Sequence, residues 1–263
     1  FIREKQLTFI IPQSLSRFHL TEKNFSPAIH CERSINSAGD SVFTYIVTNM
    51  SAMKDEKQMP ATGKVYPHIL ITGSFKDYHD MYCWSNKLAQ VDCNVPEINI
   101  LLAKITAGCH TDMGKIRNTY AWVQQNIRYI AFEAGILGHR PDTPAEVLRK
   151  RYGDCKGMSL LLRTLLKAQG FDARLTDIGT IDIPYRMSEI ATLASANHMI
   201  CSLIYQGKTY YLDATNEYIP LEFIPESIQG REAMIENGEE CIVQTVPILD
   251  SSASTDSLYY TCT

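Results

Sequence analysis

Residues 152–170, YGDCKGMSLLLRTLLKAQG, predict the helix on which the rest of the fold depends. Asp154 is a typical N-cap residue, and Gly170 is a typical residue just past a helix C-terminus. We therefore predict a helix that begins at Asp154 or Cys155 and ends before Gly170. Its apolar side chains recur one turn apart, as on a helix face that is buried against a core: they are Met158, Leu161, Leu162, Leu165 and Leu166.

The first turn of this helix carries Cys155, and that position favours a reactive cysteine. Unpaired backbone N–H groups and the positive end of the helix dipole both point at the first turn, where they favour thiolate over thiol. The thiolate is the nucleophilic form, and Gly153 keeps the approach to it open. A small buried cysteine at a helix start would look the same by itself, because free cysteines usually serve packing.

A hairpin further along the chain supplies the partners that a thiolate nucleophile needs. Residues 198–213, HMICSLIYQGKTYYLD, read as two strands joined by a Gln-Gly turn. If Tyr205 pairs with Lys208, then His198 and Asp213 are diagonal neighbours on one face, roughly 7 Å apart at the backbone. A histidine can take and return a proton. A carboxylate beside it can fix its tautomer and stabilise its cation.

Three separated motifs follow one another in the order found in the transglutaminase-like superfamily, which the sequence resembles. The residues that carry this likeness are YGDCKGMS (152–159) with AQGFDAR (168–174), then NH (197–198), then YLDAT (211–215). Upstream, residues 122–130 and 138–141 are similar to the bacterial branch of that core. The resemblance covers about residues 97–225.

The resemblance implies an α+β, papain-like core in which Cys155 is the nucleophile. It also implies that His198 is the general base and acid, and that Asp213 is the orienting carboxylate. Members of the family use an oxyanion donor as well. Trp122, Tyr129 and the backbone N–H of Cys155 are candidates for that donor, and no motif decides between them; Trp122 fits the packing pattern of its own predicted helix.

Regions on both sides of the core are also expected. Three short segments rich in β-branched and aromatic residues predict strands near the N-terminus, and residues 45–56 resemble the β-rich domain that precedes this core in secreted proteins of Bacteroidetes-type bacteria. Because the chain begins at Phe1, we expect a piece of a longer protein with a truncated first domain. The predicted domains are 1–95 (β-rich), 96–225 (catalytic core) and 226–263 (linker and start of a C-terminal β region).

Composition narrows the classes of partner. The chain is 45% hydrophobic and 21% charged with a net charge of -4, which is typical of a globular protein. No Lys/Arg run suggests nucleic acid binding, and no apolar stretch is long enough to span a bilayer. We expect a peptide or protein substrate, and no cofactor or metal. The family layout implies a periplasmic or extracellular location.

We expect cysteine-dependent acyl transfer on an amide, with a peptidase or amidase favoured over a cross-linking transglutaminase because bacterial members include peptidases. A second hypothesis is a non-catalytic binding or scaffold module of a larger envelope protein.

A third is a zinc site of Cys93, Cys109 and His110, whose spacing is unusual for zinc. A Cys83–Cys93 disulfide is also compatible with the sequence.

Overall fold

The computed structural model describes residues 1–54, 56–57, 59–131, 134–253 and 259. They form two compact units, one of residues 1–82 with 181–197 and the other of residues 83–180 with 198–263. This division differs from the boundaries at 95/96 and 225/226 that the sequence suggests. Helix and strand are mixed in the chain, as the expected α+β class requires.

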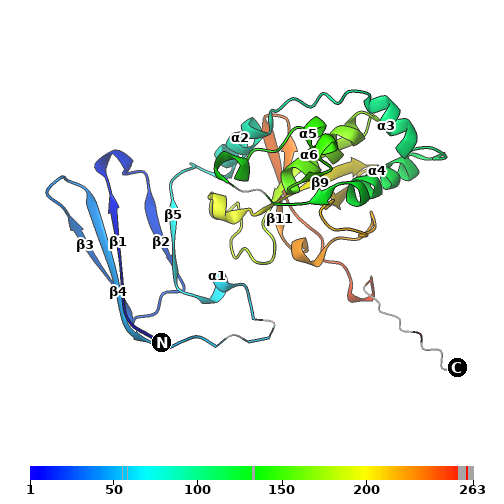
Figure 1. Cartoon of the computed structure of the whole chain (residues 1–263). Coiled ribbons are helices and arrows are strands. Elements are labelled where there is room, and N and C mark those ends of the chain that lie inside the picture. Colours follow the sequence, from blue (N-terminus) through cyan, green and yellow to red (C-terminus); the bar gives the residue numbers. More distant parts are fainter. Residues whose placement is uncertain (55, 58, 132–133, 254–258, 260–263) are drawn as a thin grey trace. The chain divides into compact units, whose positions relative to one another are not determined.

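The first unit is built on two antiparallel sheets (Figure 1). A three-stranded sheet has the order β1-β4-β3, and β2 pairs with β5 in a second sheet. The rings of Phe9 and Phe25 meet the buried Tyr45 edge-on at 5.9 and 5.6 Å between centroids. The elements are β1 (Ile2–Ile11), β2 (His19–Lys23), β3 (Ile29–Ile35), β4 (Ser41–Met50), α1 (Thr62–Val65) and β5 (His68–Thr72), and α2 (Tyr78–Ala89) begins here.

Residues 181–197 return to this unit after a long excursion of the chain. The hydroxyl of Tyr185 bonds to Nε2 of His68. A Cβ added at Gly63 would lie 2.7 Å from Cγ of Pro184, so only glycine allows the chain segments to approach this closely. No periodic pattern marks residues 181–197, so their place in the first unit was not foreseen.

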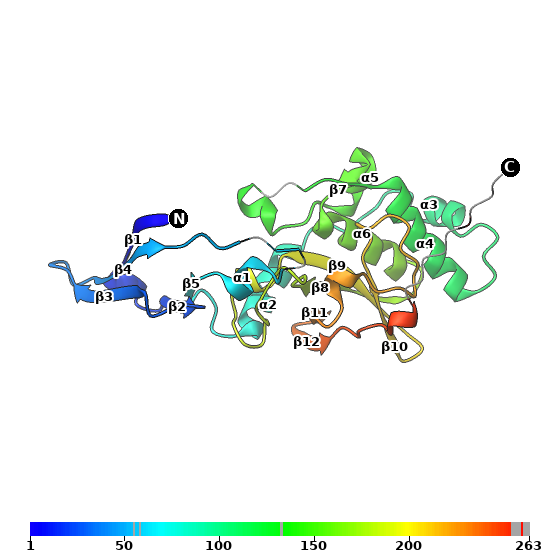
Figure 2. The same ribbon diagram turned by 90° about the horizontal axis from the view of Figure 1, so that it is seen from below.

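The second unit contains a five-stranded sheet with the order β10-β9-β8-β11-β12 (Figures 1 and 2). Helix α6 packs against β8 and β9, and α4 and α5 pack against α6. The elements are α3 (Ile98–Ile105), α4 (Asp112–Asn126), β6 (Arg128–Tyr129), α5 (Pro144–Lys150), β7 (Tyr152–Gly153), α6 (Cys155–Lys167), β8 (Asp172–Ile178), β9 (His198–Tyr205), β10 (Lys208–Leu212), β11 (Glu232–Asn237) and β12 (Glu240–Thr245).

The predicted central helix is confirmed, together with both of its ends. The side chain of Asp154 caps α6 by accepting a bond from the Gly157 N–H at 2.9 Å. Gly170 has a φ of 87° just past the helix, a conformation that favours glycine. The cap and the glycine therefore fix where the chain enters and leaves α6.

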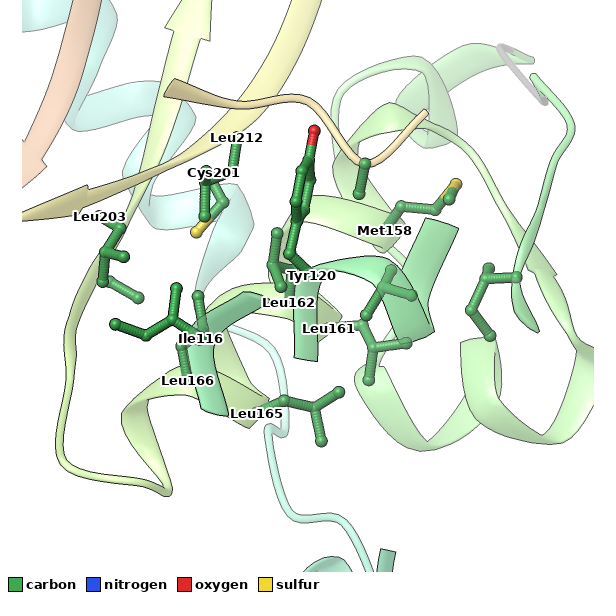
Figure 3. Close-up of a cluster of buried hydrophobic side chains, with 14 of the residues drawn as sticks. Ile116, Tyr120, Met158, Leu161, Leu162, Leu165, Leu166, Cys201, Leu203 and Leu212 are labelled. Atoms are coloured by element: carbon green, nitrogen blue, oxygen red, sulfur yellow. The ribbon is translucent and has the colours of Figure 1, made fainter. Parts of the chain in front are cut away.

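The apolar stripe of α6 forms the middle of the main core (Figure 3). Its five residues are each no more than 1% exposed. They pack with Ile116 and Tyr120 of α4 and with Leu203 and Leu212 of the sheet. Burying a leucine side chain contributes about 1.5–3 kcal/mol, so this stripe holds α6 firmly on the sheet.

Residues beyond 225 extend the core sheet. Strand β11 pairs antiparallel with β8, for example Met234 with Asp177, and β12 pairs with β11. This region was expected to be a linker and the start of a separate β region, and the sheet hydrogen bonds explain why it joins the second unit. Of residues 254–263, only Tyr259 lies within the described part of the chain. No helix in the described residues is sufficiently long and apolar to cross a membrane.

Candidate active site

Three elements of the second unit bring the predicted site residues to one place. Cys155 is the first residue of α6, His198 is the first residue of β9, and Asp213 directly follows β10. The β9–β10 register is the one expected from the Gln-Gly turn, with Lys208 opposite Tyr205. The hairpin thus places His198 and Asp213 as the sequence predicts.

The imidazole of His198 connects the other two side chains. Its Nε2 lies 3.0 Å from Oδ2 of Asp213, and the two side chains are only 12% and 2% exposed. His198 also forms a side-chain hydrogen bond with Cys155. Because Asp213 occupies Nε2, the nitrogen left for the sulfur is Nδ1.

The charges of these neighbours change how readily His198 loses its proton. Burial alone would lower the pKa of His198 by disfavouring the cation. Hydrogen bonds and Coulomb attraction from Asp213 and Cys155 outweigh burial and raise this pKa to about 10. The imidazole is therefore held in its protonated form at neutral pH, as a proton donor requires.

The carboxylate of Asp213 is held by more than the histidine. Its Oδ1 accepts from the backbone N–H of Thr215 at 3.1 Å and from the Thr215 hydroxyl at 2.7 Å, and its Oδ2 accepts from Nδ2 of Asn216 at 2.7 Å. Burial would raise the pKa of Asp213, but bonds from His198 and Thr215 lower it overall. Sequence reasoning missed Thr215 and Asn216, although Asp-Ala-Thr is a recognisable Asx-turn pattern.

Two side chains of α4 hold the segment that carries Asp213. The hydroxyl of Tyr120 donates to the carbonyl of Asp213 at 3.0 Å. One turn later, Nε2 of Gln124 donates to the carbonyls of Asn216 at 2.6 Å and Ile219 at 3.1 Å. In Figure 3 the Tyr120 hydroxyl points away from the apolar stripe. We call residues 213–219 the acid loop, and α4 anchors both ends of it.

A buried ion pair flanks the cysteine. Nζ of Lys156 lies 2.5 Å from Oδ2 of Asp154, with the side chains 7% and 11% exposed. Burial raises the pKa of Asp177, on β8, to about 6, against the opposing effects of a bond from Ser85 and the charge of Lys156. Residues on either side of Cys155 are therefore fixed by charge as well as by helix geometry.

Apolar side chains surround Cys155, which is itself 6% exposed. Its buried cluster includes Leu160 of the same helix and Met199 of β9, and Cys93 packs against that cluster. Cys93 has a free thiol that donates to the carbonyl of Val91. The Cys83–Cys93 disulfide that the sequence allows is thus not formed.

The side chains considered as oxyanion donors have different surroundings. Trp122 packs against the main core, and the guanidinium of Arg151 lies 5.5 Å from its ring centroid. Tyr129 pairs with Gly153 in the short parallel β6–β7 ladder, beside the chain that enters α6. Tyr129 thus lies beside the start of α6, whereas Trp122 lies against the core.

The zinc hypothesis finds no support in the geometry. Among the residues that the structure describes, no group of three or more His, Cys, Asp and Glu side chains is placed to hold a metal ion. The sulfur of Cys109 instead accepts a bond from Nδ2 of Asn118 at 3.1 Å. Cys93, Cys109 and His110 are not gathered into a site.

A family model matches the part of the chain that holds the central helix. Residues 100–185 match the transglutaminase-like superfamily. This stretch of the chain is therefore similar to that superfamily. The matched residues include Cys155 and end before His198, so the placement of His198 and Asp213 rests on the geometry described above. A search of curated proteins gave no match.

One solved structure shares the fold of this chain. A crystal structure from Parabacteroides distasonis ATCC 8503, named a candidate protease, matches with a TM-score of 0.68 at 15% identity over 93% of this chain. The present chain spans 45% of that chain's length. A candidate cysteine protease from Cytophaga hutchinsonii (TM-score 0.36, 15% identity, 80% of this chain and 66% of that one) and a TGase (0.34, 13%, 76% and 51%) are more distant.

Proposed function

We propose that the second unit is a cysteine-dependent enzyme that transfers the acyl group of an amide, with Cys155 as nucleophile. The observation that carries this proposal is the double contact of His198, which bonds to Asp213 on one side and to Cys155 on the other. A nucleophile beside a base that a third group orients is the arrangement that covalent catalysis requires.

In the first step the Cys155 sulfur attacks the carbonyl carbon of the amide and forms a tetrahedral intermediate. His198 then donates its proton to the leaving nitrogen, the C–N bond breaks, and the amine departs. The product on the protein is a thioester of Cys155. Asp213 keeps the imidazole oriented and stabilises its cation throughout.

In the second step an acceptor releases the acyl group. His198 takes a proton from the acceptor, which attacks the thioester carbonyl, and the C–S bond breaks to restore Cys155. Water as the acceptor gives a peptidase or amidase, and an amine gives a cross-linking transferase. We favour hydrolysis because bacterial members of the superfamily include peptidases.

Labelling of the thiols tests whether Cys155 is activated. The protein is treated with limiting iodoacetamide at neutral pH, and mass spectrometry measures the rate at each cysteine. Cys155 is expected to react fastest despite its burial. Cys201 is the internal control, because burial raises the pKa of its thiol to about 12. Labelling of Cys155 no faster than that of the partly buried Cys93 would favour the scaffold alternative.

The acceptor is tested with a mixed library of acetylated peptides and a fluorescent primary amine. Hydrolysis is expected to yield new peptide carboxyl groups, each carrying one atom of ¹⁸O when the reaction is run in H₂¹⁸O. Incorporation of the amine instead would indicate a transglutaminase. Neither product, with slow labelling of Cys155, would leave the non-catalytic binding module as the better account.

We place the protein in the cell envelope, periplasmic or extracellular, on the resemblance of its layout to exported proteins. Fractionation of the source cells with an antibody against this chain tests that location. Recovery in the cytoplasmic fraction would contradict it.

A further inference from the structure

A pocket of about 270 Å³ opens beside the start of α6. Asp154, which immediately precedes Cys155, forms part of its wall. A group bound there would lie close to the residue whose sulfur attacks the substrate. The volume is small for a whole ligand and suits one side chain. The lining residues are Ala134, Leu137, Arg140, Asp142, Lys150, Tyr152 and Asp154.

Most charged side chains that line the pocket already form ion pairs. Nζ of Lys150 lies 3.2 Å from Asp142 and 3.7 Å from Glu146. Asp154 is paired with Lys156. Each carboxylate of the wall therefore already has a cationic partner, and the pocket offers no open carboxylate to a basic ligand.

Arg140 is the exception. Among the described residues, no carboxylate lies within ion-pair distance of its guanidinium, whereas both wall carboxylates are paired. A guanidinium presents a planar fork of donors that matches a carboxylate. The remaining wall is largely apolar, from Ala134, Leu137 and the ring of Tyr152. Such a pocket suits a short apolar stem that ends in a carboxylate.

We propose that this pocket is a substrate subsite for a carboxylate next to the reacting amide, with Arg140 as its partner. The inference rests on the proposed function and adds a substrate class to it. The carboxylate belongs to the peptide, either as an acidic side chain or as a free C-terminus. Arg140 then determines specificity, and it takes no part in the acyl-transfer step itself.

The test measures alkylation of Cys155, so it needs no turnover. Three probes share one reactive group: N-iodoacetyl-glutamine amide is neutral, N-iodoacetyl-glutamate amide has a side-chain carboxylate, and N-iodoacetyl-glutamine has a terminal one. In each, the sulfur displaces iodide from the same carbon. Mass spectrometry gives the rate of alkylation of Cys155 by each probe. Each carboxylate probe's rate is divided by that of the neutral probe in the same protein, which removes differences in Cys155 reactivity between wild type and variants.

At least one carboxylate probe is expected to react about tenfold faster than the neutral probe, corresponding to about 1.4 kcal/mol. The probe that does so identifies a side-chain or a terminal carboxylate as the ligand. Arg140→Gln should bring the ratio close to one, and Arg140→Glu should bring it below one. Arg149→Gln is the matched control, because Arg149 is an exposed arginine that pairs with Glu146 and does not line the pocket; its ratio should match the wild type.

A ratio near one in the wild-type protein, or a preference that survives Arg140→Gln, would overturn the subsite. A preference that survives Arg140→Gln would mean that the cationic His198 attracts the carboxylate. The variant therefore separates the charge of Arg140 from the charge of His198. Failure of the proposed function looks different. In that case no amide is cleaved and Cys155 labels slowly with every probe, while a rate ratio that depends on Arg140 would still support the subsite.

Discussion

Nε2 of His198 and Oδ2 of Asp213 lie 3.0 Å apart, at the open end of a hairpin and far from its Gln206-Gly207 turn. The strands therefore set this contact, with no need for a flexible loop to find it. The bond leaves Nδ1 for Cys155, so the imidazole can serve both neighbours at once.

Asp213→Asn tests the role of the carboxylate. The amide nearly preserves the shape of the side chain but carries no charge, so the imidazolium loses its main electrostatic partner. We expect amide hydrolysis to fall by on the order of 10³–10⁴-fold. The pKa of His198, measured by NMR, should fall below its value of about 10. An unchanged pKa would show that the charge of Asp213 does not act on His198.

Cys155→Ala should abolish acyl transfer and leave the fold intact. The substitution removes one buried sulfur from a helix start whose cap, Asp154, is unaffected. Activity should fall by on the order of 10⁴-fold or more, and His198→Ala should cost nearly as much. Cys93→Ala, in the same apolar surroundings, is the matched control and should keep its activity. Equal losses in both variants would point to packing and against nucleophilic catalysis.

Stability should depend on the proton that His198 holds. Its pKa of about 10 in the folded protein lies above the ordinary imidazole value of 6.5, so the folded state binds the proton more tightly. This contribution is fully present below about pH 6.5 and is lost as the pH rises to about 10. Urea unfolding of wild type and His198→Gln across that range checks the sign: the wild type's relative advantage should shrink with increasing pH.

The anchors of the acid loop should affect catalysis without contacting the substrate. Tyr120→Phe and Gln124→Leu each leave buried carbonyls without their donors, which costs about 1–3 kcal/mol of unfolding free energy. If the loop positions Asp213, kcat should fall while KM changes little, and the pKa of His198 should fall. Asn118→Leu, elsewhere on α4, is the control. A loss of stability with normal kcat and pKa would reduce both residues to a structural role.

The central helix and the hairpin were predictable because their signals are local. An apolar stripe with a cap defines α6, and a two-residue turn fixes the register that brings His198 near Asp213. The roles of these residues in catalysis stay predictions. The pairing of β11 with β8 was not predictable, because it joins segments more than 50 residues apart in sequence, and no local pattern specifies such a partner.

Side chains that act on distant backbone escaped the sequence reasoning for the same reason. Tyr120 fits the apolar stripe of α4, and its hydroxyl bond to Asp213 spans 93 positions in the chain. The sequence suggests that Gln124 is an ordinary polar helix residue. However, it is only 5% exposed and donates hydrogen bonds to two backbone carbonyls. Only the folded arrangement shows that both residues support the acid loop.

The return of residues 181–197 to the first unit has a consequence for dissecting the protein. The chain leaves the second unit after Thr180 and re-enters it at His198, so neither unit is one continuous piece of sequence. A fragment that started at residue 83 would keep this excursion but lose the side chains on which it packs, such as His68 beside Tyr185. Deletion mapping at the apparent boundary would therefore report misfolding and could be mistaken for a catalytic requirement.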